Sequence, residues 1–429
     1  MSQRAISPGT TRARTIPTRT MLARTMIVAG VMSGTSADGI NVALVRVGES
    51  TTGSREGSGA TSGSRGPECP RHIIKLLGHA EYAYSPKVRA AVLGAMNATR
   101  ARVDDLARLN FLLGELYADA VLATQRQFRV KADLVGCHGQ TLYHQGEAQG
   151  FLGRKVTATW QTGDSAVIAA RVGVPVVSDF RPADMAAGGK GAPLVPYLDS
   201  ILFRDAKIGR IVQNIGGIAN LTAIPPGGDA GDVFAFDTGP GNMVIDAVTD
   251  VLFGRAFDRG GKIAASGKVL ESVVEPMLRR NFFRAKPPKT AGREEFGREF
   301  VRECLRRCGR ARKQDVVATA TALTARSIAD AVKRFVISKS GSATKNSFRE
   351  MILSGGGARN ATLVAMLAKE LAPLGVTLRF SDEFGLPSEA KEAVAFALLA
   401  YETWNRRPSN LPSATGAKRG AVLGKISYA

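Results

Sequence analysis

Two short glycine-rich segments combine residue types that bind phosphate. The segment SGTSADG, residues 33–39, lies between two apolar runs, and NIGGIAN, residues 214–220, lies between two others. Small residues let the backbone approach a ligand closely, and consecutive amides in such a turn form a nest for anions. The carboxylate of Asp38 in the first segment is a ligand type that Mg²⁺ accepts. The first segment is not a Walker loop, because the chain returns as a strand and not as a helix.

A carboxylate with the placement of a general base follows the second turn. Asp237 lies in FDTGPGNM, residues 236–243, where a predicted strand ends and a Gly-Pro-Gly turn opens a helix. An acid held at the end of a strand is well placed to take a proton from a reacting group. Further along, residues 355–357 are a triple glycine between a predicted strand and a helix, which suits a flat ligand such as adenine. A simple tight turn has the same composition, so this motif is weak by itself.

A third group of residues places polar side chains at the ends of other predicted strands. GCHGQT holds His138 and Gln140, and the stretch DFRPADMAAGGKGAPL holds Arg181, Asp184 and Lys190. Arg181 and Lys190 can contact a carboxylate or a phosphate, and His138 can orient a substrate hydroxyl. A lone histidine is more often structural. These five are the predicted substrate-binding residues.

The segments that carry chemistry alternate with predicted strands and helices. The strand–turn–strand unit around the first glycine turn recurs around the second, and helical periodicity separates further strands. This pattern favours an α/β fold with an N-terminal domain over residues 26–208 and a C-terminal domain over residues 209–429. Two Ser/Gly-rich stretches, 49–68 and 338–347, are predicted flexible loops. Residues 1–25 are predicted to be a disordered or targeting extension.

The composition limits the class of protein. The 429 residues are 44% apolar and 22% charged, which excludes a wholly disordered chain. No stretch approaches the ~20 apolar residues of a membrane span, so no membrane association is predicted. The net charge of +21 lies partly in residues 1–25 and 284–313 without any nucleic-acid-binding motif, so nucleic acid is not a predicted partner. The four cysteines lack disulfide or metal spacing, which indicates a cytoplasmic protein; organelle targeting by residues 1–25 stays open.

Taken together, the motifs resemble the anhydro-N-acetylmuramic acid kinase family over residues 28–424. The motifs that carry the resemblance are GVMSGTSADGINVALV, GCHGQTLYH, QTGD, VVSDFRPADMAAGGKGAPLVP, NIGGIANLT, FDTGPGNMVIDA, SGGGARN and NLPSATGAKRGAVLG. The resemblance implies a two-domain actin/hexokinase-like (ribonuclease H-like) fold with an interdomain cleft for ATP and substrate. The implied reaction opens the 1,6-anhydro ring of anhydro-N-acetylmuramic acid with water and phosphorylates O6 from ATP. Its product is N-acetylmuramic acid 6-phosphate, an intermediate of peptidoglycan recycling.

The resemblance also implies roles for single residues. Asp237 is the implied base that activates water, and Glu392 in EAVAFA matches a family glutamate near the site. ATP and Mg²⁺ are the implied cofactors, and a homodimer is implied as well. The predicted nucleotide-binding residues are Gly34, Thr35, Ser36, Ala37, Asp38, Gly39, Ile40, Asn41, Asn214, Gly216, Gly217, Gly355, Gly356 and Gly357.

The sequence departs from the family pattern in three places. Asn41 stands where the family often has Asp, and Lys190 stands where GGQGAPL usually has Gln. Pro182 and Ala183 replace a more basic pair. The last two departures fall in the predicted substrate region, so the alternative prediction is a kinase of the same superfamily that acts on a different sugar or metabolite. A sugar sensor without catalysis is disfavoured by the presence of Asp237 and both glycine turns.

Overall fold

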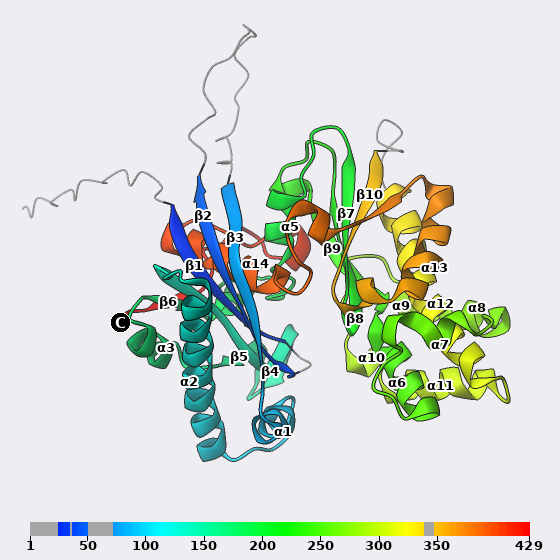
Figure 1. Ribbon diagram of the computed structural model, residues 1–429, viewed down its shortest axis with the longest axis horizontal. Coiled ribbons are helices and arrows are strands. Elements are labelled where there is room, and N and C mark those ends of the chain that lie inside the picture. Colours follow the sequence, from blue (N-terminus) through cyan, green and yellow to red (C-terminus); the bar gives the residue numbers. More distant parts are fainter. Residues whose placement is uncertain (1–24, 35–36, 50–71, 339–346) are drawn as a thin grey trace, which may run out of the picture.

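Each glycine turn joins two antiparallel strands, as the apolar runs on either side predict. Strand β1 (Met26–Ser33) pairs with β2 (Gly39–Glu49), and β7 (Gly209–Ile215) pairs with β8 (Ile218–Ile224). The two hairpins belong to two different sheets, one in each lobe of the protein (Figure 1).

The computed structural model describes most of the chain. The described residues are 25–34, 37–49, 72–338 and 347–429. Several predictions fall outside them: residues 1–24 of the extension, residues 50–68 and 339–346 of the two loops, and Thr35 and Ser36 of the first turn.

The two sheets share one strand order. The first runs β12-β6-β4-β1-β2-β3, with β5 paired to β4, and the second runs β11-β10-β7-β8-β9. In each, three successive strands form an antiparallel meander, and the first strand of the meander lies parallel to the next strand inward. This duplicated topology confirms the predicted α/β, ribonuclease H-like fold class. The remaining strands are β3 (His72–Ala83), β4 (Leu134–Phe151), β5 (Arg154–Thr162), β6 (Val176–Ser178), β9 (Phe234–Pro240), β10 (Phe348–Ser354), β11 (Thr377–Phe380) and β12 (Lys425–Ser427).

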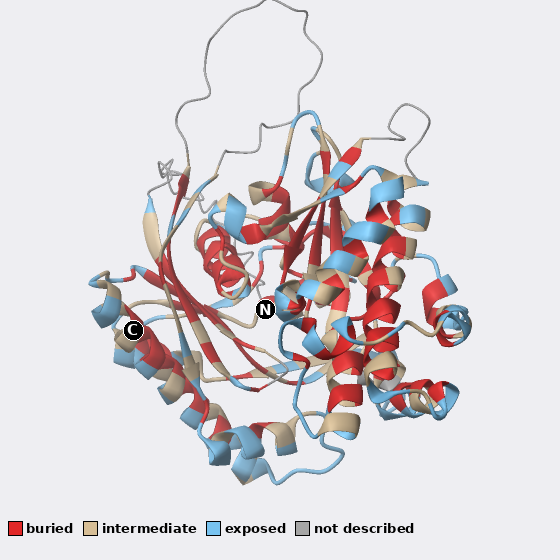
Figure 2. Cartoon of the chain, turned by 45° about the vertical axis from the view of Figure 1, so that its right-hand side comes forward, coloured by how far each residue is buried: buried red, intermediate tan, exposed pale blue. Residues whose placement is uncertain are grey.

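Helices cover the sheets and bury their apolar faces. In the first lobe α2 (Val103–Phe128) packs over the meander, and its buried side chains form one core with those of β1 and β2. In the second lobe α12 (Lys313–Ala331) is buried along most of its length. Figure 2 shows buried residues in red on helices and strands inside the protein. The other helices of the two lobes are α1 (Pro86–Ala95), α3 (Ser165–Val172), α4 (Phe180–Ala186), α5 (Pro196–Leu202), α6 (Asn242–Phe253), α7 (Lys262–Ala265), α8 (Glu271–Leu278), α9 (Asn281–Arg284), α10 (Arg293–Phe296), α11 (Arg298–Cys308), α13 (Ala361–Leu371) and α15 (Pro412–Thr415).

The C-terminal part of the chain returns to the first lobe. Helix α14 (Lys391–Trp404) lies against β1 and β4, where a Cβ at Gly30 or Gly136 would overlap the helix backbone. Strand β12 pairs with β6 of the first sheet. The predicted division at residue 208/209 assigned both elements to the second domain, and the structure corrects that assignment. A helical pattern shows which face of a helix is apolar, but not which sheet that face will cover.

A buried ion pair lies where α14 meets the second lobe. Lys391 Nζ is 2.8 Å from Asp199 Oδ1, and Thr222 of β8 donates a hydrogen bond of 3.0 Å to Asp199 Oδ2. Both charged side chains are almost fully buried. None of the helices in the described part of the chain is long and apolar enough to cross a membrane.

Candidate active site

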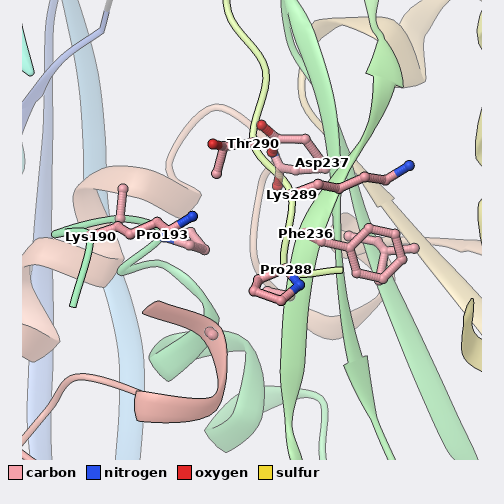
Figure 3. Close-up of a pocket in the computed structure, with 12 residues that line it drawn as sticks. Lys190, Pro193, Phe236, Asp237, Pro288, Lys289 and Thr290 are labelled. Atoms are coloured by element: carbon pink, nitrogen blue, oxygen red, sulfur yellow. The ribbon is translucent and has the colours of Figure 1, made fainter. Parts of the chain in front are cut away.

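A pocket opens between the two lobes. Lys190 and Pro193 from the first lobe line one side, and Phe236, Asp237 and Thr290 from the second lobe line the other (Figure 3). Residues far apart in the sequence therefore face one another across a single cavity. An interdomain cleft was predicted, and this pocket lies where that cleft would be.

Asp237 is the carboxylate among the described residues that line this pocket, and its pKa is perturbed. It lies in β9, its side chain is half-buried, and its Oδ2 accepts a hydrogen bond of 2.7 Å from the Ala291 amide. Burial raises the pKa of Asp237 to about 6, while the Ala291 amide and the nearby Lys289 charge act in the opposite direction. A carboxylate with a pKa near 6 is mostly ionised at neutral pH, yet it is a stronger base than an ordinary one.

The glycine motifs of the second lobe meet at one place. The carbonyls of Gly216 and Gly217 accept hydrogen bonds from the amides of Asn242 (2.7 Å) and Gly241 (2.9 Å), so the β7–β8 turn lies against the start of α6. Residues 355–357 approach the same turn. They come so close that a Cβ at Gly355, whose φ is +83°, would lie 2.5 Å from Asn214 Oδ1. A Cβ at Gly357 would overlap Ile215. The predicted second-lobe nucleotide residues are therefore neighbours, with backbone exposed between them.

The described part of the first glycine turn lies at the end of β1. Ala37 has a left-handed φ of 52°, and its amide donates to the Gly34 carbonyl at 3.1 Å. Asp38 is exposed, and Arg89 Nη2 lies 3.1 Å from its Oδ1. Beyond Gly39 the strand begins, and Ile40 packs into the core.

Two of the polar residues predicted near the first turn are held by partners within the protein. Asn41 Oδ1 lies 2.9 Å from His79 Nε2. Gln140 is fully buried; its Oε1 accepts from Ser33 Oγ at 2.7 Å, and its Nε2 donates to the Gly34 carbonyl at 3.2 Å. Gln140 thus holds the start of the first turn through Ser33 and Gly34. Its contact with substrate remains a prediction.

His138 and Arg181 form a buried pair. Arg181 Nη2 lies 2.8 Å from His138 Nε2, and His138 Nδ1 lies 2.7 Å from the Gly139 carbonyl. This pairing requires a neutral imidazole with its proton on Nδ1. Burial, and then the Arg181 charge, lower the pKa of His138 well below its ordinary value, which agrees with that tautomer. Burial also lowers the pKa of Arg181 to about 10, against the opposing charges of Glu392 and Asp184.

Asp184 is fully buried and surrounded by donors. Its Oδ2 accepts from the Gly191 amide at 2.8 Å, and its Oδ1 accepts from Asn410 Nδ2 and Thr415 Oγ1, both at 2.7 Å. The carboxylate therefore ties the loop that contains Lys190 to the C-terminal segment. Its predicted direct contact with substrate is not needed to explain its burial, and it remains a prediction.

Lys190 lines the pocket, whereas Glu392 is not among the described residues that line it. Lys190 Nζ lies 2.6 Å from Glu147 Oε1, and Lys190 lines the same pocket as Asp237. Glu392 lies in the first turn of α14, and its side chain is exposed. The protein around Glu392 still raises its pKa by desolvation, against the positive charges of Lys391 and Arg181.

The sequence did not point to the segment that contacts Asp237. Pro288, Lys289 and Thr290 line the pocket, and Ala291 supplies the amide that holds the carboxylate. The stretch AKPPKTAG, residues 285–292, has no strong periodicity, and its composition marks it only as part of a basic region. Its prolines and single threonine carried no sign that it would lie beside β9.

The residues present are compatible with a magnesium ion that arrives with ATP. Mg²⁺ is commonly bound by one or two carboxylates together with substrate phosphates and waters. Asp38 offers one exposed carboxylate beside the first turn, although Arg89 also contacts it. Among the described residues no group of three His, Cys, Asp or Glu side chains forms a preformed metal site.

The family model and the curated relatives that match this chain carry the same name. The model of the family "Anhydro-N-acetylmuramic acid kinase" matches residues 26–429. The anhydro-N-acetylmuramic acid kinases of Bacillus cereus strain AH187 and Bacillus thuringiensis subsp. konkukian strain 97-27 are 42% and 41% identical over 406 residues, which is 94% of this chain and 99% of each relative. Among solved structures, the activator of the 2-hydroxyisocaproyl-CoA dehydratase from Clostridium difficile matches 88% of this chain and 95% of its own at 13% identity, with a TM-score of 0.37.

Proposed function

The chain belongs to the anhydro-N-acetylmuramic acid kinase family, and on that premise we propose that it is an ATP-dependent kinase of anhydro-N-acetylmuramic acid. The enzyme adds water to C1 of the sugar, breaks the C1–O6 bond of the 1,6-anhydro ring, and transfers the γ-phosphoryl group of ATP to O6. The products are N-acetylmuramic acid 6-phosphate and ADP. Such a reaction belongs to peptidoglycan recycling and amino-sugar catabolism.

The observation that carries this proposal is the position of Asp237. It lies in a pocket lined by both lobes, and burial raises its pKa to about 6. Among the described residues, only the Ala291 amide hydrogen-bonds to its carboxylate, through Oδ2. Oδ1 is therefore free to accept a proton from water as that water attacks C1. No separate acid is required, because the phosphoryl group captures the O6 that leaves C1.

The glycine turns are proposed to hold the nucleotide. The first turn with Asp38 and the second with Gly216 and Gly217 offer backbone amides to the phosphates, and the triple glycine at residues 355–357 faces the base and sugar. Phosphoryl transfer depends mainly on positioning and on neutralising charge. Asp38 would hold Mg²⁺, which supplies positive charge at the phosphates when bound.

The polar residues of the first lobe are proposed to hold the sugar. Lys190 lies across the pocket from Asp237 and can pair with an anionic group of substrate or ATP. The neutral His138, fixed by Arg181, can orient a hydroxyl, and Glu392 provides a second carboxylate at the cleft. Gln140 and Asp184 are proposed to hold the segments that carry these contacts in place.

Some features of the whole protein are also part of the proposal. We infer a cytoplasmic enzyme, because its ATP and its sugar substrate would be available there, and a homodimer on the basis of the family. The domain boundary near residues 208/209 is proposed together with a C-terminal segment that belongs structurally to the first lobe.

The direct test is product analysis. Purified enzyme is incubated with ATP, Mg²⁺ and either anhydro-N-acetylmuramic acid or free hexoses, and ADP release is measured beside mass spectrometry of the sugar. We expect rapid ADP release only with the anhydro sugar, together with a product heavier by one phosphoryl group and one water. Faster turnover of another sugar would instead support the alternative specificity suggested by Lys190, Pro182 and Ala183.

A further inference from the structure

A connecting segment completes the open edge of the second sheet. Strand β9 is the last strand of that sheet, and residues 285–292, between α9 and α10, pass beside it. The Asp237 amide donates a hydrogen bond of 3.0 Å to the Lys289 carbonyl. Edge strands have unpaired backbone groups, so this segment supplies a partner at the position of the proposed base.

The same segment holds the side chain of Asp237. The Ala291 amide donates to Oδ2 at 2.7 Å, two residues beyond the carbonyl that accepts from the Asp237 backbone. Backbone and carboxylate are therefore fixed by one short stretch of chain. Thr290, between the two contacts, lines the pocket together with Lys190 (Figure 3).

Lys289 anchors this segment through a buried side chain. It is 7% exposed, and its ammonium group donates to the Phe282 carbonyl at 3.0 Å. The ammonium also lies 4.5 Å and 5.1 Å from the ring centroids of Phe282 and Phe335. Figure 3 shows the Lys289 side chain lying across the strands and pointing away from Lys190. Lys289 therefore borders the pocket with part of its side chain, while its ammonium group is held by Phe282 and Phe335 in the second lobe.

The charges around Lys289 come from several elements. Burial, and then the charge of Arg334, lower the pKa of Lys289 to about 8, while Asp330 and Asp237 act in the opposite direction. The Lys289 charge in turn lowers the pKa of Asp237. A buried ammonium is costly to keep, and here it is stabilised by a carbonyl, two aromatic faces and the charge of the proposed base.

From these contacts we propose that Lys289 is a positioning residue for the reaction. It ties the 285–292 segment to the body of the second lobe, so that the Ala291 amide holds Oδ2 of Asp237 and leaves Oδ1 facing the cleft. This inference rests on the proposed function of Asp237 as the base. It adds a residue that acts through Asp237 and touches neither substrate.

The test replaces Lys289 by a side chain of similar length without charge. Lys289→Met should lower kcat by about 10- to 100-fold, because a base displaced by an ångström loses that much. KM for ATP and for the anhydro sugar should stay within about twofold, because no ligand contact is lost. The acid limb of the pH–rate profile should move to higher pH, since a positive charge near Asp237 is removed. Lys286→Met is the matched control, because Lys286 is exposed in the same segment.

A second variant tests the contact without changing the buried side chain. Ala291→Pro removes the amide that holds Oδ2 and should also lower kcat, with Lys286→Met again as the control. An unchanged kcat in folded Lys289→Met or Ala291→Pro protein would overturn the proposal. So would a loss of thermal stability with an unmoved pH profile. If the unmodified enzyme fails to act on the anhydro sugar, the proposed function fails, which is a separate outcome.

Discussion

Asp184 and Asp237 are both aspartates beside the interlobe pocket, but the protein surrounds them differently. Asp184 accepts three hydrogen bonds, from Gly191, Asn410 and Thr415, and has no exposed surface. Asp237 accepts one from Ala291 and lines the pocket. A carboxylate whose oxygens already accept several hydrogen bonds has little room for water or a ligand, whereas one with a free oxygen in a poorly solvated site can act as a base.

The regions around Asp184 and Asp237 therefore have different roles. Around Asp184, the loop with Lys190 and the C-terminal segment are joined into one rigid wall of the pocket. Around Asp237, the edge of a sheet and the 285–292 segment present a reactive group. We therefore expect substitutions in the first region to change stability and substitutions in the second to change turnover.

The largest expected effect is the loss of turnover in Asp237→Asn. The amide keeps the shape but cannot take a proton, so kcat should fall by about 10²–10⁴-fold while ATP binding is retained. Steady-state kinetics and calorimetric titration with ATP measure the two quantities. Asp246→Asn is the control, because Asp246 also has a pKa raised to about 6 by burial but is not among the residues that line the pocket. Near-normal turnover in Asp237→Asn would remove this residue from the mechanism.

The next effect is on folding. Asp184→Asn leaves three donors around a neutral side chain that brings a donor of its own, and should lower the free energy of unfolding by about 3 kcal/mol. Urea denaturation followed by circular dichroism measures it. Asp237→Asn should leave stability unchanged or higher at pH 7.5, because it removes a carboxylate whose ionised form is disfavoured by burial. Equal destabilisation by both substitutions would end the distinction between the two regions.

A smaller and graded effect is expected with pH. The pKa of Asp237 is raised to about 6, so kcat/KM should be constant above that pH and fall as pH drops below it, by about tenfold per unit. The stability contribution has the opposite sense. A carboxyl whose folded pKa exceeds its unfolded value stabilises the protein below the unfolded pKa, and that contribution is lost as pH rises through about 6. Rate and stability profiles that move together between pH 4 and 7 would contradict this assignment.

The smallest effect concerns one donor to Asp184. Thr415→Val keeps the volume of the side chain and removes the 2.7 Å hydrogen bond to Oδ1, so unfolding should become easier by about 1–2 kcal/mol without a change in kcat. A double-mutant cycle with Asp184→Asn provides the control. The two effects should be less than additive, because both remove the same contact. Full additivity would mean that this hydrogen bond does not stabilise the wall of the pocket.

Local sequence predicted much of the fold because hairpins are local structures. The glycine turns of residues 33–39 and 214–220 lie between strands that pair as their apolar runs indicate. The duplicated unit led to the right fold class, and Asp237 was predicted as the base from its place at a strand end. The motifs around residues 216 and 355 were predicted to serve one ligand, and the structure brings them into contact.

The sequence could not show which distant segments pack together or share hydrogen bonds. The packing of α14 on β1 and β4 depends on space left by Gly30 and Gly136, which only the folded sheet reveals. The donors that saturate Asp184 come from Asn410 and Thr415, more than 200 positions away in the chain.

By itself, then, the sequence determined the local elements, the glycine turns and the chemical types at their ends, because these depend on neighbouring residues and on backbone sterics. Only the tertiary structure decided which carboxylate would be saturated and which would keep a free oxygen. It did so by placing Gly191, Asn410 and Thr415 around Asp184 and the Ala291 amide beside Asp237. Burial and hydrogen bonding set the basicity of a carboxylate, and both arise from contacts between parts of the chain that the sequence keeps far apart.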